Sequence, residues 1–141
     1  MGMINFRTPN FRKVLNYTFN NVFTFSAAAG SSGVCTVTVT LKKANGDAVT
    51  NSPFFIVYLS DDAAGYGLTG TTASGAVAVT TGKEIAAITA QKAIIVQPDN
   101  TGKVVFTITD TAKTLFYIAA KTMDMLTSGV SSRLTTANYG A

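Results

Sequence analysis

The chain contains 141 residues, a length that is typical of one domain and sufficient to bury a core without disulfides or a metal. Charged residues make up 13% of it, the formal net charge is +4, and there is no histidine. Without histidine the chain can form neither a Ser-His or Cys-His nucleophile pair nor a histidine metal site. A serine–lysine pair stays open, but no serine lies in a motif that would nominate one. We therefore expect no enzyme, no cofactor and no bound metal.

Cys35 is the chain's single cysteine and cannot form an internal disulfide. It lies in an alternating run of valine and threonine at residues 34–39, a position typical of a buried and unreactive thiol. No segment resembles a secretory signal peptide, and no apolar run approaches the ~20 residues that span a bilayer. We therefore expect a soluble protein, made in a reducing compartment such as the cytoplasm, with no membrane partner.

Threonine occurs 22 times, and β-branched and small residues outnumber the charged residues that favour helices. This composition predicts an all-β protein. A surface of threonine, serine, asparagine and alanine carries little of the charge that keeps a free monomer soluble. The composition is therefore typical of a protein that works while assembled against other protein.

Residues 1–25 are predicted to form an N-terminal arm and a leading strand. The first 20 residues carry three basic residues and no acidic residue, and Pro9 disfavours an early helix. Interleaved basic and aromatic residues could contact nucleic acid or form a local strand, but three charges are a small footprint for phosphate binding. We favour an arm that inserts its aromatic side chains into a neighbouring protein, with no nucleic acid as partner. The predicted contact residues are Phe6, Arg7, Phe11, Arg12, Lys13, Tyr17 and Phe19.

Residues 26–120 are predicted to form an antiparallel β-sandwich. Residues 27–33 are small and indicate a loop, and the Asn45-Gly46 pair and residues 98–102 indicate turns. Residues 84–89 fit either a strand or one helical turn. Short strands with turns at intervals of about 8–12 residues are typical of a sandwich, without fixing its topology. The strands are expected at residues 34–41, 53–59, 76–80, 93–97, 103–109 and 115–120.

Residues 121–141 lose the apolar pattern of the preceding strands and are predicted to form a C-terminal tail. An extended tail can place isolated aromatic or aliphatic side chains in pockets of a neighbouring protein. The predicted contact residues in this tail are Arg133, Leu134 and Tyr139.

The stretch from Ser60 to Gly70, SDDAAGYGLTG, resembles a functional site because it holds adjacent carboxylates, three glycines and a tyrosine. Asp61 and Asp62 could contribute to a calcium site, but the next carboxylate after them is Glu84, so this segment provides only two ligands. The two aspartates could instead form an acid/base pair of carboxylates. The stretch could also be a phosphate-binding loop, because glycines leave backbone amides accessible. The interpretation that we favour is a turn capped by Ser60 and Asp61, in which the glycines let the chain cross between sheets.

Two segments resemble pieces of known families. Asn45-Gly-Asp-Ala-Val49 and residues 98–109, PDNTGKVVFTIT, are similar to the turn-and-strand segments of bacterial and phage immunoglobulin-like domains. This resemblance implies a sandwich and leaves open whether its topology is immunoglobulin-like or a jelly roll.

The whole chain, from the aromatic N-terminal segment to its Tyr-Gly-Ala end, resembles the capsid cement (decoration) proteins of tailed bacteriophages, in particular those of Bordetella-type podoviruses. The resemblance rests on length, on the order of the segments and on the threonine-rich, weakly charged texture. It implies a jelly-roll body that sits on the outer capsid surface of the virion and binds the major capsid protein. It also implies that the protein ties neighbouring capsomers together.

Two further expectations accompany this resemblance. A sandwich edge can pair with its own copy, so a homodimer on the capsid is expected. The alternative function is an immunoglobulin-like binding module of the phage tail or fibre, which would touch a cell-surface ligand such as carbohydrate through loop tips near residues 64–74.

Overall fold

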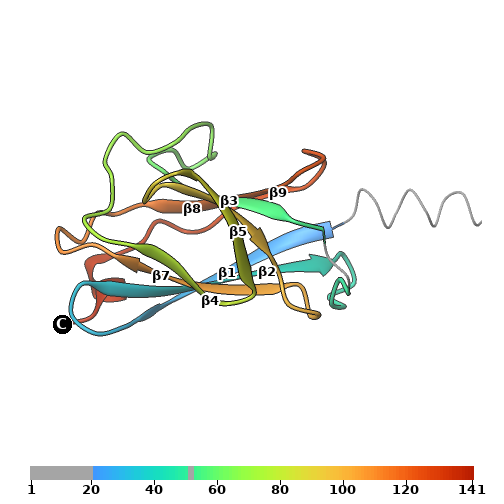
Figure 1. Ribbon diagram of the computed structural model, residues 1–141, viewed down its shortest axis with the longest axis horizontal. Helices are drawn as coiled ribbons and strands as arrows, with labels where there is room; N and C mark the ends of the chain where they lie inside the picture. Colours follow the sequence, from blue (N-terminus) through green and yellow to red (C-terminus); the bar gives the residue numbers. More distant parts are fainter. Residues whose placement is uncertain (1–20, 51–52) are drawn as a thin grey trace, which may run out of the picture.

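The computed structural model describes residues 21–50 and 53–141, which fold into two antiparallel β-sheets packed face to face (Figure 1). The predicted all-β class and sandwich are confirmed. The elements are β1 (Asn21–Ala29), β2 (Val34–Lys43), β3 (Phe55–Ser60), β4 (Val77–Thr81), β5 (Lys83–Thr89), β6 (Ala93–Gln97), β7 (Lys103–Thr109), β8 (Tyr117–Thr122), β9 (Ser128–Val130) and the short 3-10 helix η1 (Thr136–Tyr139).

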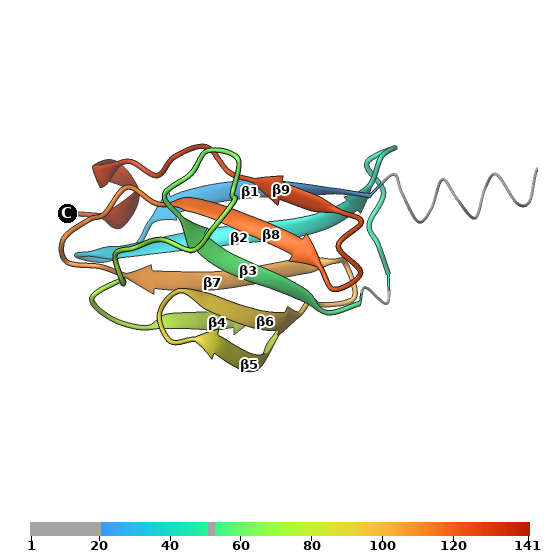
Figure 2. The ribbon, with the colours of Figure 1, turned by 90° about the horizontal axis from the view of Figure 1, so that it is seen from above.

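The spatial order of the strands resembles that of immunoglobulin-like domains. One sheet has the order β1-β2-β7-β4 and the other the order β5-β6-β3-β8-β9 (Figure 2). In immunoglobulin-like domains strands A, B, E and D form one sheet and strands C, F and G the other. The first sheet fills the A, B, E and D positions, β3, β8 and β9 fill the C, F and G positions, and the β5–β6 hairpin is added beside β3. The chain passes through the β5–β6 hairpin between β4 and β7, however, whereas strands D and E follow each other directly in immunoglobulin-like domains. The structure is therefore a β-sandwich whose strand neighbours match the immunoglobulin-like alternative in space and whose connectivity differs from it.

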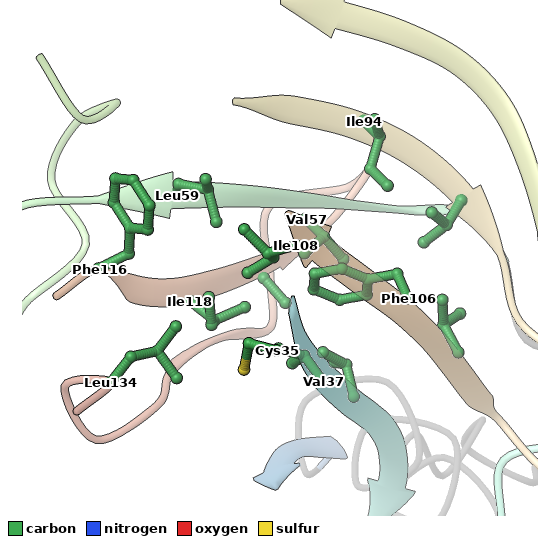
Figure 3. Packing of buried hydrophobic residues seen from close by; sticks show 14 of the residues in the cluster. Cys35, Val37, Val57, Leu59, Ile94, Phe106, Ile108, Phe116, Ile118 and Leu134 are labelled. Carbon is green, nitrogen blue, oxygen red and sulfur yellow. The ribbon is translucent and has the colours of Figure 1, made fainter. Parts of the chain in front are cut away.

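The core lies between the two sheets and is filled by the alternating apolar positions of both. In β2 and β7 every second residue is fully buried while the intervening residues are half-buried. Figure 3 shows these side chains meeting those of β3 and β8 from the facing sheet. The fully buried members from β2, β3, β7 and β8 are Cys35, Val37, Val39, Leu41, Phe55, Val57, Leu59, Val104, Phe106, Ile108, Ile118 and Ala120.

Two predicted connections differ from the structure. Ala27, Ala28 and Ala29 were expected in a loop, but they continue β1 because they pair in register with β2. The Asn45-Gly46 turn is confirmed, and the amide of Gly46 donates to the carbonyl of Lys43 at 2.9 Å. This turn does not join two paired strands, however, since β2 and β3 belong to different sheets. Residues 84–89, for which a strand or a helical turn was open, lie in the edge strand β5.

The C-terminal segment is part of the sandwich and not a free tail. Residues 117–122 form β8 and residues 128–130 form β9, which pairs with it. Leu134 and Tyr139 have exposed fractions of 3% and 0% and belong to the main hydrophobic cluster. The domain therefore extends past the predicted boundary at residue 120. At the other end, β1 begins at Asn21, within the segment 1–25 that was predicted to hold the arm and a leading strand.

Cys35 provides a test of the core. Its side chain is fully buried, and burial raises the pKa of the thiol to about 11. At pH 8 this pKa leaves about one thiol in a thousand ionised, and only the thiolate reacts with thiol reagents. We expect native Cys35 to react with a disulfide reagent such as DTNB at least ~100-fold more slowly than the urea-unfolded chain. Comparable rates in stopped-flow absorbance would show that the β2 face is not buried.

Candidate binding surfaces

The loop that follows β3 is held together by its two aspartates. Asp61 accepts hydrogen bonds from the hydroxyl of Thr69 at 2.6 Å and from the amide of Gly70 at 2.8 Å. The hydrogen bond from Thr69, followed by that from Gly70, lowers the pKa of Asp61 below its usual value. The ionised side chain therefore clamps the two ends of the loop together.

Asp62 organises the middle of the same loop. Its carboxylate accepts hydrogen bonds from the amides of Ala64 at 2.9 Å and Tyr66 at 3.4 Å, and its own amide donates to the hydroxyl of Ser60 at 3.1 Å. The predicted side-chain-capped turn is confirmed. Both carboxylates are engaged by protein donors, and in residues 21–50 and 53–141 no group of three or more Cys, Asp or Glu side chains could hold a metal ion.

The loop lies against the outer face of the five-stranded sheet, where Gly65 makes the close approach. The backbone of Gly65 has a φ of +70°, and a Cβ added there would lie 2.8 Å from a methyl of Val130 in β9. The hydroxyl of Tyr58 in β3 donates to the carbonyl of Gly65 at 2.5 Å. Lys92 ties the far end down by donating to the carbonyl of Thr69 at 3.0 Å. The loop is thus fixed on the sheet at several points.

The fixed loop and the sheet enclose an apolar groove of about 240 Å³. Tyr66, with an exposed fraction of 87%, and Leu68, with 47%, project from the loop. Ile88 of the edge strand β5 also lines the groove and is 52% exposed. The complete lining is Ile56, Tyr58, Gly65, Tyr66, Gly67, Leu68, Ile88, Ala93 and Lys121. Exposed aromatic and aliphatic side chains around a concave site are typical of a protein-binding surface.

Further exposed apolar side chains gather at the end of the sandwich where β1 begins. The rings of Phe23 in β1 and Phe55 in β3 lie 5.1 Å apart, and Phe55 is the register partner of Thr122 in β8, so the three strands share this end. We call this set the apolar end: Val22, Phe54, Met123, Met125 and Leu126, which are 42–63% exposed. Methionine-rich apolar surfaces adapt readily to a protein partner.

A second, more polar crevice of about 210 Å³ opens beside β1 and the segment that follows β9. Arg133 lines it and donates through Nε to the carbonyl of Leu115 at 3.0 Å. The amide side chain of Asn138, from η1, lies 3.5 Å from the carbonyl of Ala27. These contacts hold the C-terminal segment against the rest of the domain, and they occupy one nitrogen of the guanidinium.

Comparison of the chain with protein-family models, with curated proteins and with solved structures finds no match. Among the described residues, no helix is long and apolar enough to span a membrane.

The structure separates the predicted contact residues into three groups. Phe6, Arg7, Phe11, Arg12, Lys13, Tyr17 and Phe19 lie outside the described residues. Arg133 is exposed, as a contact residue would be. Leu134 and Tyr139 are not available to a partner, because their side chains complete the core of their own domain. The groove was missed, although a tyrosine between two glycines at residues 65–67 signals a side chain presented by a tight loop.

Proposed function

We propose that this protein is a structural component of a tailed-phage particle that binds the outside of the capsid shell and cements neighbouring major capsid proteins. The observation that carries the proposal is the set of apolar side chains left exposed at the groove, Tyr66, Leu68 and Ile88, together with those of the apolar end. Beneath the loop that carries Tyr66, the outer face of the five-stranded sheet is already covered, and Tyr58, Ala93 and Ala119 form a buried cluster there with Ile56 and Val130 packed against it. These exposed apolar side chains support a protein that functions docked against other protein.

In a decoration role, many copies of the protein bind the shell and share its reinforcement. A shell is reinforced when each small clamp bridges two subunits, so that no single contact has to be strong. The exposed groove and the apolar end lie on different parts of the domain, which gives one molecule two separate surfaces for two neighbours. The aromatic and basic segment 1–20 leads into β1 at the apolar end and adds a third contact in this proposal. Pairing of two copies on the capsid is also part of the proposal.

The immunoglobulin-like strand order favours a second candidate, a binding module of the phage tail or fibre. Such a module would contact a cell-surface ligand through the loop that presents Tyr66. The two functions differ in stoichiometry, since a cement covers the shell while a tail module is present in few copies.

Copy number tests the proposal first. Particles of the phage that encodes this chain would be purified, and the chain would be quantified by mass spectrometry against the major capsid protein. We expect a ratio near one to one. A few copies per particle would transfer the function to the tail or a vertex, and absence from the particle would exclude both functions.

Removal of residues 1–13 tests the arm. We expect the truncated protein to fold, because the described sandwich starts at Asn21, and to fall off capsids during sedimentation. The expected loss of occupancy is at least tenfold at matched protein concentration. The control is the full-length chain added to the same undecorated capsids. Normal decoration by the truncated chain would show that the arm does not contribute to capsid binding.

A further inference from the structure

The two outer faces of the sandwich differ in chemistry. On the four-stranded sheet the outward positions of β2 and β7 are mainly threonines, among them Thr36, Thr38 and Thr107. On the five-stranded sheet the outward positions of β3 are Ile56 and Tyr58, and the loop adds Tyr66 and Leu68. One outer face is therefore suited to water and the other to a partner.

The groove on the second face is already organised in the free protein. The carboxylates of Asp61 and Asp62 fix the loop that carries Tyr66, and the Tyr58 hydroxyl holds the loop at Gly65. Little conformational entropy has to be lost when a ligand enters a site whose walls are fixed in advance. A tyrosine and branched aliphatic side chains around a concave floor suit apolar side chains of a peptide.

The charge of the groove selects among peptides. Lys121 is its one charged lining residue, and its ammonium lies 6.0 Å from the centre of the Tyr58 ring. Within the described part of the chain no carboxylate pairs with this ammonium. A cation beside an apolar floor attracts a carboxylate and repels another cation, and the effect is larger where water is displaced.

We propose that this groove binds an apolar peptide segment of a partner protein that carries a carboxylate placed to pair with Lys121. This inference rests on the proposed function only because it takes the partner to be a protein. It specifies the chemistry of the partner segment that occupies the groove. A segment of the shell protein with two or more apolar side chains and one aspartate or glutamate would satisfy it. The apolar side chains would contact Tyr66, Leu68 and Ile88, and the carboxylate would meet Lys121.

Two other occupants fit the groove less well. Segment 1–20 of this chain or of a second copy carries Arg7, Arg12 and Lys13 and no acid, so its charge has the same sign as Lys121. A second copy could instead pair along the edge strand β5. The register of β5 with β6 is broken near Ile85 and again near Ile88, however, and bulges of this kind protect an edge from regular pairing.

The test is a selection from a random heptapeptide display library on the immobilised full-length chain. We expect enriched peptides with at least two apolar residues and one aspartate or glutamate. In fluorescence anisotropy they should bind Lys121→Glu at least tenfold more weakly than the unaltered chain. Lys121→Glu used as bait should enrich lysine and arginine instead. The matched control is Lys42→Glu, which changes a lysine on the opposite sheet and should leave the affinity unchanged.

Each contrary result would overturn the proposal. Failure to enrich any peptide, or enrichment of peptides without a carboxylate preference, would remove the predicted ligand chemistry. Competition by a synthetic peptide of residues 1–20 at equal or higher affinity would assign the groove to the arm. A dimer in sedimentation that is lost in Tyr66→Asp would assign it to a second copy. None of these results alters the copy number per particle, so the proposed function can fail or survive separately.

Discussion

Tyr139→Ala is expected to lower the free energy of unfolding by about 3–5 kcal/mol, the range measured for truncating a large buried aromatic side chain. Tyr139 is fully buried in the main core although only two residues follow it in the sequence. Its hydroxyl donates a hydrogen bond to the carbonyl of Thr114, which joins η1 to the connection between β7 and β8. The substitution would leave a cavity and an unpaired carbonyl. Urea denaturation followed by tyrosine fluorescence or circular dichroism measures the loss.

Two further variants make this result specific. Tyr139→Phe keeps the ring and removes the hydroxyl, so we expect a smaller loss of about 1 kcal/mol, the typical net value of one hydrogen bond. Tyr66→Ala removes an aromatic ring that is 87% exposed, and it should change stability by less than about 0.5 kcal/mol. If Tyr139→Ala were as stable as Tyr66→Ala but failed to decorate capsids, the C-terminal segment would be an external anchor, as its sequence suggested.

The contrast between β7 and the C-terminal segment shows what the sequence could predict. Residues 93–97 and 103–109 were assigned with the bounds of β6 and β7, because alternation and a strong turn at residues 98–102 are local signals. Leu134 and Tyr139 are isolated apolar residues among polar neighbours, so no alternation of apolar and polar residues indicates that they are buried. Tyr139 lies in η1, which contacts β1 and β2 near the other end of the described chain, and the amide of Leu134 donates to the carbonyl of Phe116; local pattern does not encode these contacts.

The candidate site also has one feature that the sequence could predict and one that it could not. The turn at Ser60 and Asp61 was predictable because serine and aspartate cap backbone amides within a few residues. The groove was not, because Tyr58, Tyr66, Ile88 and Lys121 come from four segments that meet only in the folded sheet. The strand order was equally hidden, since the β5–β6 hairpin and β4 join different sheets although they are consecutive in the chain.

Asp110→Asn is expected to destabilise the protein at pH 7 by about 1–3 kcal/mol, the range for leaving a buried polar group poorly paired. Asp110 is 1% exposed and follows β7. Its two carboxylate oxygens accept hydrogen bonds from the amides of Ser74 at 3.2 Å and Thr114 at 2.7 Å, and its own amide donates to the carbonyl of Gly33. Three loops therefore meet at this residue. An asparagine can offer an oxygen to one amide only, and its own NH₂ group would face the other.

The effect of Asp110→Asn should depend on pH in a defined direction. Burial alone would raise the pKa of Asp110, but the hydrogen bonds from Thr114 and Ser74 outweigh it and hold the pKa below its usual value. Because the folded pKa lies below the unfolded value of about 3.9, the ionised group stabilises the fold fully above that pH. This contribution is lost as pH falls through the folded pKa. The stability difference between the two proteins should therefore be largest at pH 7 and shrink toward pH 2.5.

The matched control for Asp110→Asn is Glu84→Gln, which removes an exposed carboxylate from the edge strand β5 and should cost less than about 0.5 kcal/mol at either pH. Comparing differences between variants matters, because the pKa values of Asp61, Asp99 and Asp124 are also lowered and the whole protein should weaken in acid. A difference for Asp110→Asn that is equally large at pH 2.5 would mean that packing, and not the buried charge, holds the three loops together.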